Sequence, residues 1–313
     1  MADGDRTTTH DVTLPAAPVT WPDGRQAAAF LGFDMDAEDV ALTVDPESRH
    51  RLSAMSHQAY GPLTGMPRVL DLLKRHDLRA TFFCPGYTAE RYPDLLRRVR
   101  DEGHEIAHHG YLHEAIAGMT RQEEADVLDR GLDALEQVTG DRPVGYRAPM
   151  WETTYATAEL LLDRGFTYDS SLMDADLPYE LAERPGDGAR SIVEIPVAWA
   201  LDDWEQFAFV PDLFGPGVIE DPAKALALWT GELTEAHRHG SCFTLTIHPF
   251  LSGRLGRLRA LETLIETMTG LSGLWLATGR EMAEHVGTLD LTPRVFPKPD
   301  LDLTPRVFPQ PEI

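Results

Sequence analysis

Two acidic side chains, Asp34 and Asp36, follow directly after the strand-length apolar run AAAFLGF (27–33). Two carboxylates beside a buried segment lose hydration and repel each other unless a cation or a proton lies close to them. One of them could instead cap a turn or a helix, which is a frequent role of aspartate. A metal ion held by one acid, with the other acid as catalytic base, accounts for both residues.

The segment HHGYLHE contains His109 and His113, four residues apart. Histidines at this spacing lie on one side of a helical turn and can present both imidazoles to one ion. A carboxylate from another strand would complete a set of two histidines and one carboxylate, with positions left open for water and substrate. The chain has 12 histidines, so the alternative is a chance pair in a loop, one histidine in the core and one on the surface.

Two further polar residues stand at the ends of strand-like segments. Arg147 lies in GYRAP (145–149), and His248 ends CFTLTIH (242–248). Catalytic groups of a (β/α) barrel lie just beyond the carboxyl ends of its strands, so these side chains are expected on the same face as the acids and histidines. The alternatives are a salt bridge for Arg147 and a strand end stopped by Pro249 for His248.

Short apolar runs alternate with amphipathic stretches, as in βα units that build a parallel sheet. The expected strands are residues 27–33, 79–84, 104–109, 145–149, 166–171, 191–199, 242–248 and 274–278. The expected helices are residues 66–77, 92–103, 120–140, 154–164, 221–239, 257–269 and 280–286. Seven or eight such units predict one α/β domain, a closed or nearly closed (β/α) barrel.

Two stretches at the catalytic end, residues 172–190 and 200–217, are interpreted as long irregular segments rich in Phe, Pro and Trp. They are expected to cover a small closed pocket, which favours a cyclic imide or ureide substrate over a glycan chain.

The motifs FDMDAE, HHGYLHE, GYRAPMWE and LTIHPF, in this order, resemble those of polysaccharide deacetylases of the NodB-homology type. The resemblance covers about residues 26–287 and implies a distorted (β/α) barrel. The variants Asp-Met-Asp and His-Gly-Tyr, with TFFCPG, EIPVAWALDD and HPFLSGR, are similar to one branch of that superfamily. This branch holds an intracellular peptidoglycan-deacetylase-like protein, cyclic imide hydrolases and a metal-independent allantoinase, and its members tend to be oligomers without a secretion signal.

The resemblance implies a role for each matching residue. Asp36, His109 and His113 correspond to the ligands of a divalent metal, with Zn²⁺ expected, although the one-residue gap between the acids leaves open which of them binds it. Asp34 corresponds to the catalytic base, Arg147 to the group that positions it, and His248 to the general acid. Substrate-binding positions are Tyr111, Trp151 as a pocket wall, and Asp203 in a loop that reaches into the site.

The expected reaction is hydrolysis of a non-peptide carbon–nitrogen bond, in which metal-activated water attacks, Asp34 takes a proton and His248 protonates the leaving nitrogen. The substrate is either a cyclic imide or ureide, or an N-acetylated sugar. One alternative is a metal-independent ring-opening hydrolase; another is a catalytically silent barrel used for binding. The presence of Asp34, Arg147 and His248 argues against the silent barrel.

The composition limits the possible partners. With 51 acidic against 28 basic residues, the formal charge of −23 disfavours nucleic acid and anionic membranes. The N-terminus shows no signal-peptide pattern, and the two cysteines, Cys84 and Cys242, are expected to be buried free thiols in a reducing compartment. We therefore expect a cytoplasmic protein, and the resemblance implies a homo-oligomer, a dimer or tetramer.

Both ends of the chain are expected to lie outside the barrel. Residues 1–25 are predicted to form a flexible arm that ends in the turn signal WPDG. Residues 288–313 are predicted to form an extended, proline-rich tail, in which a 12-residue unit, LDLTPRVFPKPD, is followed by a near-identical copy. A simple tandem duplication explains this tail better than a binding element does.

Overall fold

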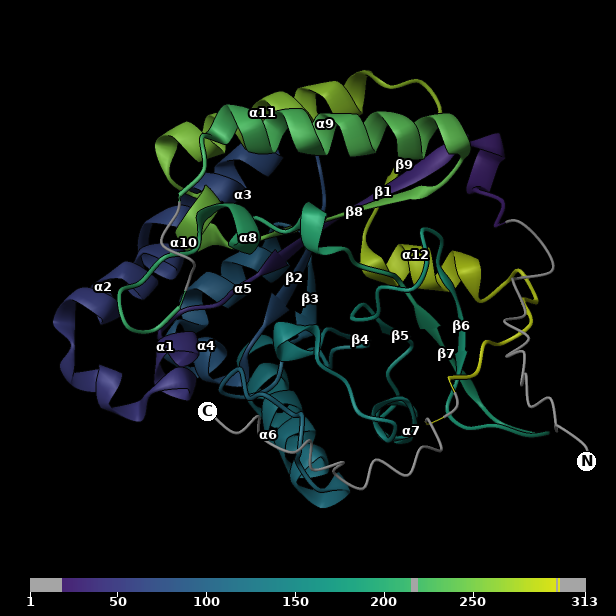
Figure 1. Cartoon of the computed structure of the whole chain (residues 1–313), viewed down its shortest axis with the longest axis horizontal. Helices are drawn as coiled ribbons and strands as arrows, with labels where there is room; N and C mark the ends of the chain where they lie inside the picture. Colours follow the sequence, from purple (N-terminus) through teal and green to yellow (C-terminus); the bar gives the residue numbers. More distant parts are fainter. Residues whose placement is uncertain (1–18, 215–218, 297, 299–313) are drawn as a thin grey trace, which may run out of the picture.

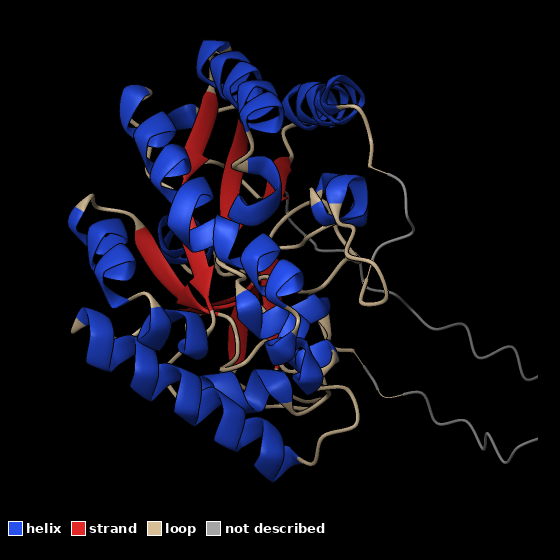
Figure 2. Ribbon diagram, turned by 90° about the vertical axis from the view of Figure 1, so that its left-hand side faces the viewer, coloured by secondary structure: helices blue, strands red, loops and turns tan. Residues whose placement is uncertain are grey.

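The computed structural model describes residues 19–214, 219–296 and 298. A curled, mixed sheet lies at its centre (Figures 1 and 2). Its strands are β1 (Ala27–Asp34), β2 (Thr81–Cys84), β3 (Glu105–His108), β4 (Gly145–Tyr146), β5 (Tyr168–Asp169), β6 (Tyr179–Ala182), β7 (Ser191–Glu194), β8 (Cys242–Ile247) and β9 (Leu274–Ala277). Their order is β6-β7-β5-β4-β3-β2-β1-β8, and β9 pairs with β1.

The pairing pattern matches the predicted distorted (β/α) barrel, with one difference in closure. The paired strands run parallel, except β6 and β7, which run antiparallel. Within the described residues β8 does not pair with β6, so the sheet forms an open half-barrel rather than a closed one. All eight expected strands form, and the carboxyl ends of β1, β3, β4 and β8 meet on one side.

The strand β6 was not predicted, because residues 172–190 were expected to be irregular. It pairs with β7 from Tyr179 opposite Glu194 to Ala182 opposite Ser191. Only four residues alternate between buried and half-buried positions, which is too short a pattern to recognise in a sequence. Part of the expected lid is therefore an edge of the sheet.

Helices surround the sheet (Figure 2). They are α1 (Glu38–Val44), α2 (Leu52–Tyr60), α3 (Met66–Arg75), α4 (Gly86–Arg91), α5 (Pro93–Asp101), α6 (Arg121–Thr139), α7 (Thr157–Asp163), α8 (Trp204–Phe207), α9 (Pro222–His239), α10 (Pro249–Ser252), α11 (Leu255–Gly270) and α12 (Gly279–Val286). Short helical turns cover Pro22–Gly24, Pro46–His50, Gly61–Gly65, Pro149–Trp151 and Trp199–Leu201. None of the helices in the described part of the chain is long and apolar enough to cross a membrane.

All seven expected helices form, and the best-defined one is α6. It begins with the predicted capping box between Thr120 and Glu123 and ends at Gly140, whose φ of 78° is left-handed. The helices α1, α2, α4, α8 and α10 were not predicted, because they are short and several belong to the insertion between β1 and β2. That insertion follows the carboxyl end of β1 and therefore lies on the catalytic side.

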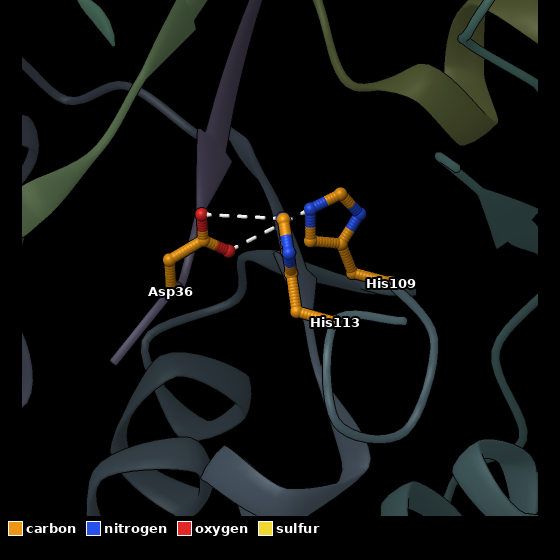
Figure 3. Close-up of side chains that lie close together, drawn as sticks. All are labelled: Asp36, His109 and His113. Atoms are coloured by element: carbon orange, nitrogen blue, oxygen red, sulfur yellow. Dashed lines mark ion pairs between the residues drawn. The ribbon is translucent and has the colours of Figure 1, made fainter. Parts of the chain in front are cut away.

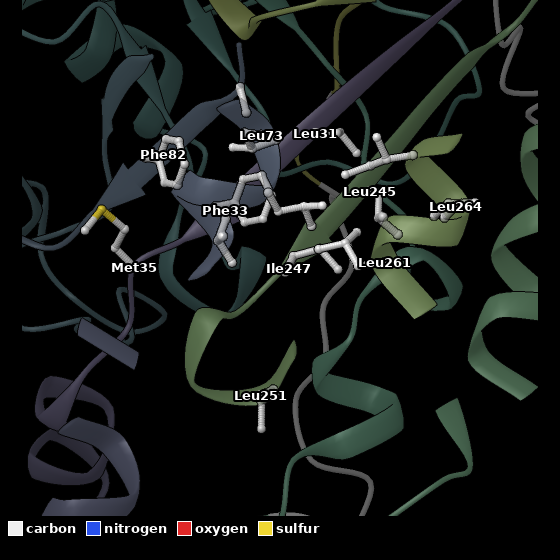
Figure 4. Close-up of a cluster of buried hydrophobic side chains, with 14 of the residues drawn as sticks. Leu31, Phe33, Met35, Leu73, Phe82, Leu245, Ile247, Leu251, Leu261 and Leu264 are labelled. Carbon is white, nitrogen blue, oxygen red and sulfur yellow. The ribbon is translucent and has the colours of Figure 1, made fainter. Parts of the chain in front are cut away.

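The main hydrophobic core fills the space between the sheet and the helices α3, α9 and α11 (Figure 4). Leu31 on β1 and Leu245 on β8 belong to this core together with Leu261 and Leu264 of α11. Each fully buried side chain of this size contributes about 1.5–3 kcal/mol to folding. Because the core holds β1 and β8 side by side, it positions the acids and the histidine that follow these two strands.

The two chain ends differ from their predicted boundaries. Residues 1–18 lie outside the described residues, but Trp21, also assigned to the arm, is buried and donates a hydrogen bond from Nε1 to the carbonyl of Gly240 at 2.9 Å. At the other end, Arg294 of the first repeated unit forms a backbone bridge to Leu181 on β6. This contact covers the edge of β6, while the second unit lies outside the described residues.

Candidate metal centre and active site

Three histidines surround the carboxylate of Asp36 at the carboxyl ends of the strands. Nε2 of His109 lies 3.6 Å from Oδ1 of Asp36, and Nε2 of His113 lies 3.5 Å from Oδ2 (Figure 3). Nε2 of His248 lies 3.5 Å from the same Oδ2 atom. The structure therefore brings residues that follow β1, β3 and β8 into one cluster.

The donor set of Asp36, His109 and His113 fits a divalent cation. All three side chains are buried, and both carboxylate oxygens of Asp36 lack a hydrogen-bond partner among the described residues. Burial, offset only in part by the charge of Asp34, lowers the pKa of His109 to about 3, and burial lowers that of His113, so both imidazoles are neutral as metal ligands must be. Nδ1 of His109 lies 2.8 Å from the carbonyl oxygen of Arg147, which directs Nε2 toward Asp36.

The loop between the two histidines is not the helical turn expected from their spacing. His109 directly follows β3, and residues 109–113 have no helical structure. Gly110 and His113 instead adopt left-handed backbone conformations, with φ values of 73° and 55°. This conformation is unfavourable for a non-glycine residue, so it is retained here at some energetic cost to bring the second imidazole back toward Asp36.

Asp34 lies beside that cluster, and its carboxylate is engaged by Arg147. Nη1 of Arg147 donates to Oδ1 of Asp34 at 2.7 Å, and its Nε and Nη2 donate to the carbonyl and hydroxyl of Ser170. Burial alone would raise the pKa of Asp34, but Arg147 and two nearby histidines outweigh it and hold that pKa below its usual value. Asp34 is thus an ionised carboxylate with its Oδ2 atom 3.8 Å from Nε2 of His109.

The space for Arg147 exists because residue 32 is glycine. A Cβ atom at Gly32 would lie 2.8 Å from Nη1 of the fully buried Arg147. Gly32→Ala is therefore expected to displace the guanidinium and lower kcat/KM by about tenfold to a hundredfold, as expected for loss of a hydrogen bond to a charged group. Steady-state kinetics and urea unfolding measure both effects.

A matched control is Gly231→Ala on α9, where a Cβ atom would meet nothing within 4 Å. It should leave kcat/KM unchanged and stabilise the helix by up to about 1 kcal/mol. If folded Gly32→Ala kept full activity, the contact between Arg147 and Asp34 would have no catalytic importance.

His248 is held by acids on the loop after β7. Oδ1 of Asp203 lies 2.7 Å from Nδ1 of His248 and accepts its backbone N–H at 2.8 Å, while Ser252 donates to Oδ2 of Asp203. Asp202 lies farther away, with Oδ1 at 3.5 Å from the same Nδ1. Burial alone would lower the pKa of His248, but these acids outweigh it and raise the pKa to about 10.

The three predicted substrate-binding residues have different positions. Asp203 is fully buried behind His248, so its geometry supports a positioning role rather than the predicted substrate contact. The Tyr111 hydroxyl donates to Glu90, and its ring packs under Arg130, so this side chain is engaged between α4 and α6. Trp151 is buried and packs against Trp199 with ring centroids 4.5 Å apart, which suits the predicted pocket wall.

Sequence reasoning missed several residues of this site. Trp199 is 47% exposed and lies three residues before Asp202. Asp39 is buried, and burial together with Asp36 raises its pKa to about 7. Asp202 stands in the noted motif EIPVAWALDD, and Asp39 directly follows the noted motif FDMDAE. A run of acids does not indicate which of them turns inward. Ser252, in HPFLSGR, donates to Asp203, but only its position four residues after His248 could have indicated this contact from the sequence.

Comparisons with known proteins identify relatives of this chain. The family model for Polysaccharide deacetylase matches residues 34–168. The peptidoglycan deacetylase of Helicobacter pylori is 35% identical over 247 residues, covering 70% of this chain and 83% of that protein. A candidate polysaccharide deacetylase from Mycobacterium smegmatis, known from its crystal structure, is 53% identical, with a TM-score of 0.89 over 92% of this chain and 99% of that chain.

A likeness of fold alone extends to PuuE allantoinase, whose crystal structure is 22% identical, with a TM-score of 0.74 over 88% of this chain and 95% of that chain. The resemblance noted in the motifs is therefore confirmed, and so is the prediction of a hydrolase that acts on carbon–nitrogen bonds other than peptide bonds. By both its sequence and its half-barrel with an Asp/His cluster, this chain belongs to the polysaccharide deacetylase family.

Proposed function

We propose that this protein removes the acetyl group from an N-acetylated sugar, with a divalent cation, expected to be Zn²⁺, held by Asp36, His109 and His113. The observation that carries the proposal is the buried Asp36 carboxylate, which faces two neutral imidazoles and has no hydrogen-bond partner among the described residues. A cation bound there would polarise the acetyl carbonyl and favour deprotonation of water at neutral pH.

A sugar is favoured here over the small cyclic substrate expected from the sequence. That expectation depends on two irregular segments, residues 172–190 and 200–217, and the first of them contains β6. The peptidoglycan deacetylase of Helicobacter pylori, at 35% identity, supports an N-acetylated sugar, whereas the allantoinase shares only the fold.

The side chains of this protein supply the proton transfers. Asp34, kept ionised by Arg147, accepts a proton from water as the hydroxide oxygen bonds to the acetyl carbon. Because Asp203 engages Nδ1 of His248, Nε2 is the nitrogen that faces the cluster and donates a proton to the leaving nitrogen. The carbon–nitrogen bond then breaks, and acetate and a free amine are released.

The experiment that tests the substrate is proton NMR of the zinc-supplemented protein with N-acetylated sugars and with cyclic imides or ureides. Release of acetate from a sugar is the expected result. Ring opening without acetate would contradict the deacetylase proposal and assign the protein to the cyclic amidohydrolases.

Removal of the metal is expected to abolish acetate release. Treatment with a chelator, followed by desalting, should lower the rate to the background, and one equivalent of Zn²⁺ should restore it. Full activity in protein shown by elemental analysis to be metal-free would contradict the proposed role of the cation and favour a metal-independent mechanism.

Two further properties remain predictions. We propose that the protein is a cytoplasmic homo-oligomer, a dimer or tetramer, that acts on a sugar or other small molecule and not on nucleic acid or membranes. Size-exclusion chromatography with light scattering measures the assembly mass, and fractionation of the source cells tests the location.

A further inference from the structure

Three arginines gather around the start of α11 and the end of α2. The guanidinium of Arg254 lies over the ring of Tyr60 at 4.1 Å, and Nη1 of Arg68 donates to the Tyr60 hydroxyl at 2.6 Å. Nη1 of Arg68 also lies 3.3 Å from the carbonyl oxygen of Gly253. One turn further along, Nη1 of Arg257 donates to the carbonyl of Leu251 at 3.1 Å. These contacts hold three cations in one region.

None of the three guanidinium groups forms an ion pair with a carboxylate within the described residues, in a protein with a formal charge of −23. Other arginines of this chain do so; Arg75, for example, binds Glu262 at 2.7 Å. A guanidinium has five N–H donors. Counted over the part of the chain that the structure describes, only Nη1 is engaged in Arg68 and Arg257, and the guanidinium of Arg254 donates no hydrogen bond. The arginines of this region therefore have unused N–H donors on positively charged groups.

The positive charge of this region affects the pKa of a neighbouring histidine. Burial, followed by the charges of Arg254 and Arg257, lowers the pKa of His57 on α2. The three arginine side chains are themselves half-buried. Burial lowers the pKa of Arg257, and the charge of Arg254 lowers it further, while the carboxylate of Asp203 offsets only part of this effect.

This arginine cluster (Arg68, Arg254 and Arg257) borders the catalytic centre. A Cβ atom at Gly61, the residue after Tyr60, would lie 3.3 Å from the backbone oxygen of Asp36. On the other side, Ser252 precedes Gly253 and donates to Asp203, the partner of His248. Figure 1 shows α2, α3 and α10 on the same side of the molecule, near the carboxyl ends of β1 and β8.

We propose that the arginine cluster is a binding subsite for an anionic group of the substrate, a phosphate or a carboxylate carried by the N-acetylated sugar. Guanidinium groups form paired, charge-assisted hydrogen bonds with either oxyanion. The inference rests on the proposed function, because it deepens the identity of that substrate: an acidic sugar derivative rather than a neutral one.

The test compares acetate release from neutral N-acetylglucosamine, N-acetylglucosamine 6-phosphate and N-acetylmuramic acid. Arg254→Gln and Arg257→Gln are expected to raise KM for an anionic sugar by about tenfold, with kcat nearly unchanged and no change for the neutral sugar. The matched control is Arg259→Gln on the same helix, an exposed arginine paired with Glu262. This variant should leave KM and kcat unchanged for all three substrates. Which anionic sugar has the lower KM distinguishes phosphate from carboxylate.

Equal effects of the variants on neutral and anionic sugars would overturn the subsite. So would unchanged kinetics together with a changed assembly mass, because the cluster would then contact a second copy of the chain.

Binding of inorganic phosphate, measured by calorimetry on the metal-depleted protein, separates this inference from the proposed function. If no sugar is deacetylated but phosphate binds wild type and Arg259→Gln about tenfold more tightly than Arg254→Gln, the deacetylase proposal fails and the subsite stands. Equal phosphate binding by all three proteins overturns the subsite even where deacetylation is observed, and so does the absence of phosphate binding together with unchanged KM for N-acetylmuramic acid in Arg254→Gln.

Discussion

Asp36→Asn is expected to abolish binding of the divalent cation, whereas Asp34→Asn is expected to keep the cation and lose turnover. The two acids are two residues apart, but only Asp36 faces both His109 and His113 with unpaired oxygens, and Asp34 is engaged by Arg147. Asparagine has nearly the same shape as aspartate, so the two variants differ from the native protein mainly in charge.

Metal analysis and thermal unfolding measure this difference. A ligand at about 100 times its Kd stabilises the native state by about 2.7 kcal/mol, and Zn²⁺ should give this stabilisation to the native protein and to Asp34→Asn but not to Asp36→Asn. Without added metal, Asp36→Asn should be no less stable than the native protein, because it removes a buried carboxylate that accepts no hydrogen bond among the described residues. Loss of metal from Asp34→Asn alone would exchange the roles of the two acids.

His248→Ala is expected to lower kcat by about 10²–10⁴-fold, the usual contribution of a general acid, while the bound metal is retained. Nε2 of His248 lies 3.5 Å from Oδ2 of Asp36, and we expect Asp36, His109 and His113 to hold the ion without it. Discontinuous assays of acetate release measure kcat, and metal analysis of the same sample measures the bound metal.

A pair of aspartate variants tests how His248 is positioned. Asp203→Asn should lower kcat by at least about tenfold, because its carboxylate lies 2.7 Å from Nδ1. Asp202→Asn should have a smaller effect, since its carboxylate lies 3.5 Å from the same atom. Equal losses in the two variants would show that the histidine responds to the summed charge of the two acids rather than to one hydrogen bond. For the His248→Ala prediction, full activity of that variant would exclude His248 as the general acid.

Much of the fold followed from local patterns. The apolar run before Asp34 forms β1 as expected, and the capping box at Thr120 begins α6 where it was predicted. These elements were predictable because their signals lie within a few neighbouring residues. In contrast, β6 and the helices α1 and α2 after β1 depend on contacts with distant segments, so their short sequences did not reveal them.

The sequence by itself determined which residues stand at strand ends, and therefore that Asp34, Asp36, His109, Arg147 and His248 would share one face of the sheet. Only the tertiary structure shows which contacts each of the two acids makes. Arg147 contacts Asp34 because β4 places it there and Gly32 leaves room for its guanidinium, so Asp36 is the acid left to face the histidines. Such choices depend on distances of a few ångströms between residues far apart in the chain, which spacing along one sequence does not encode.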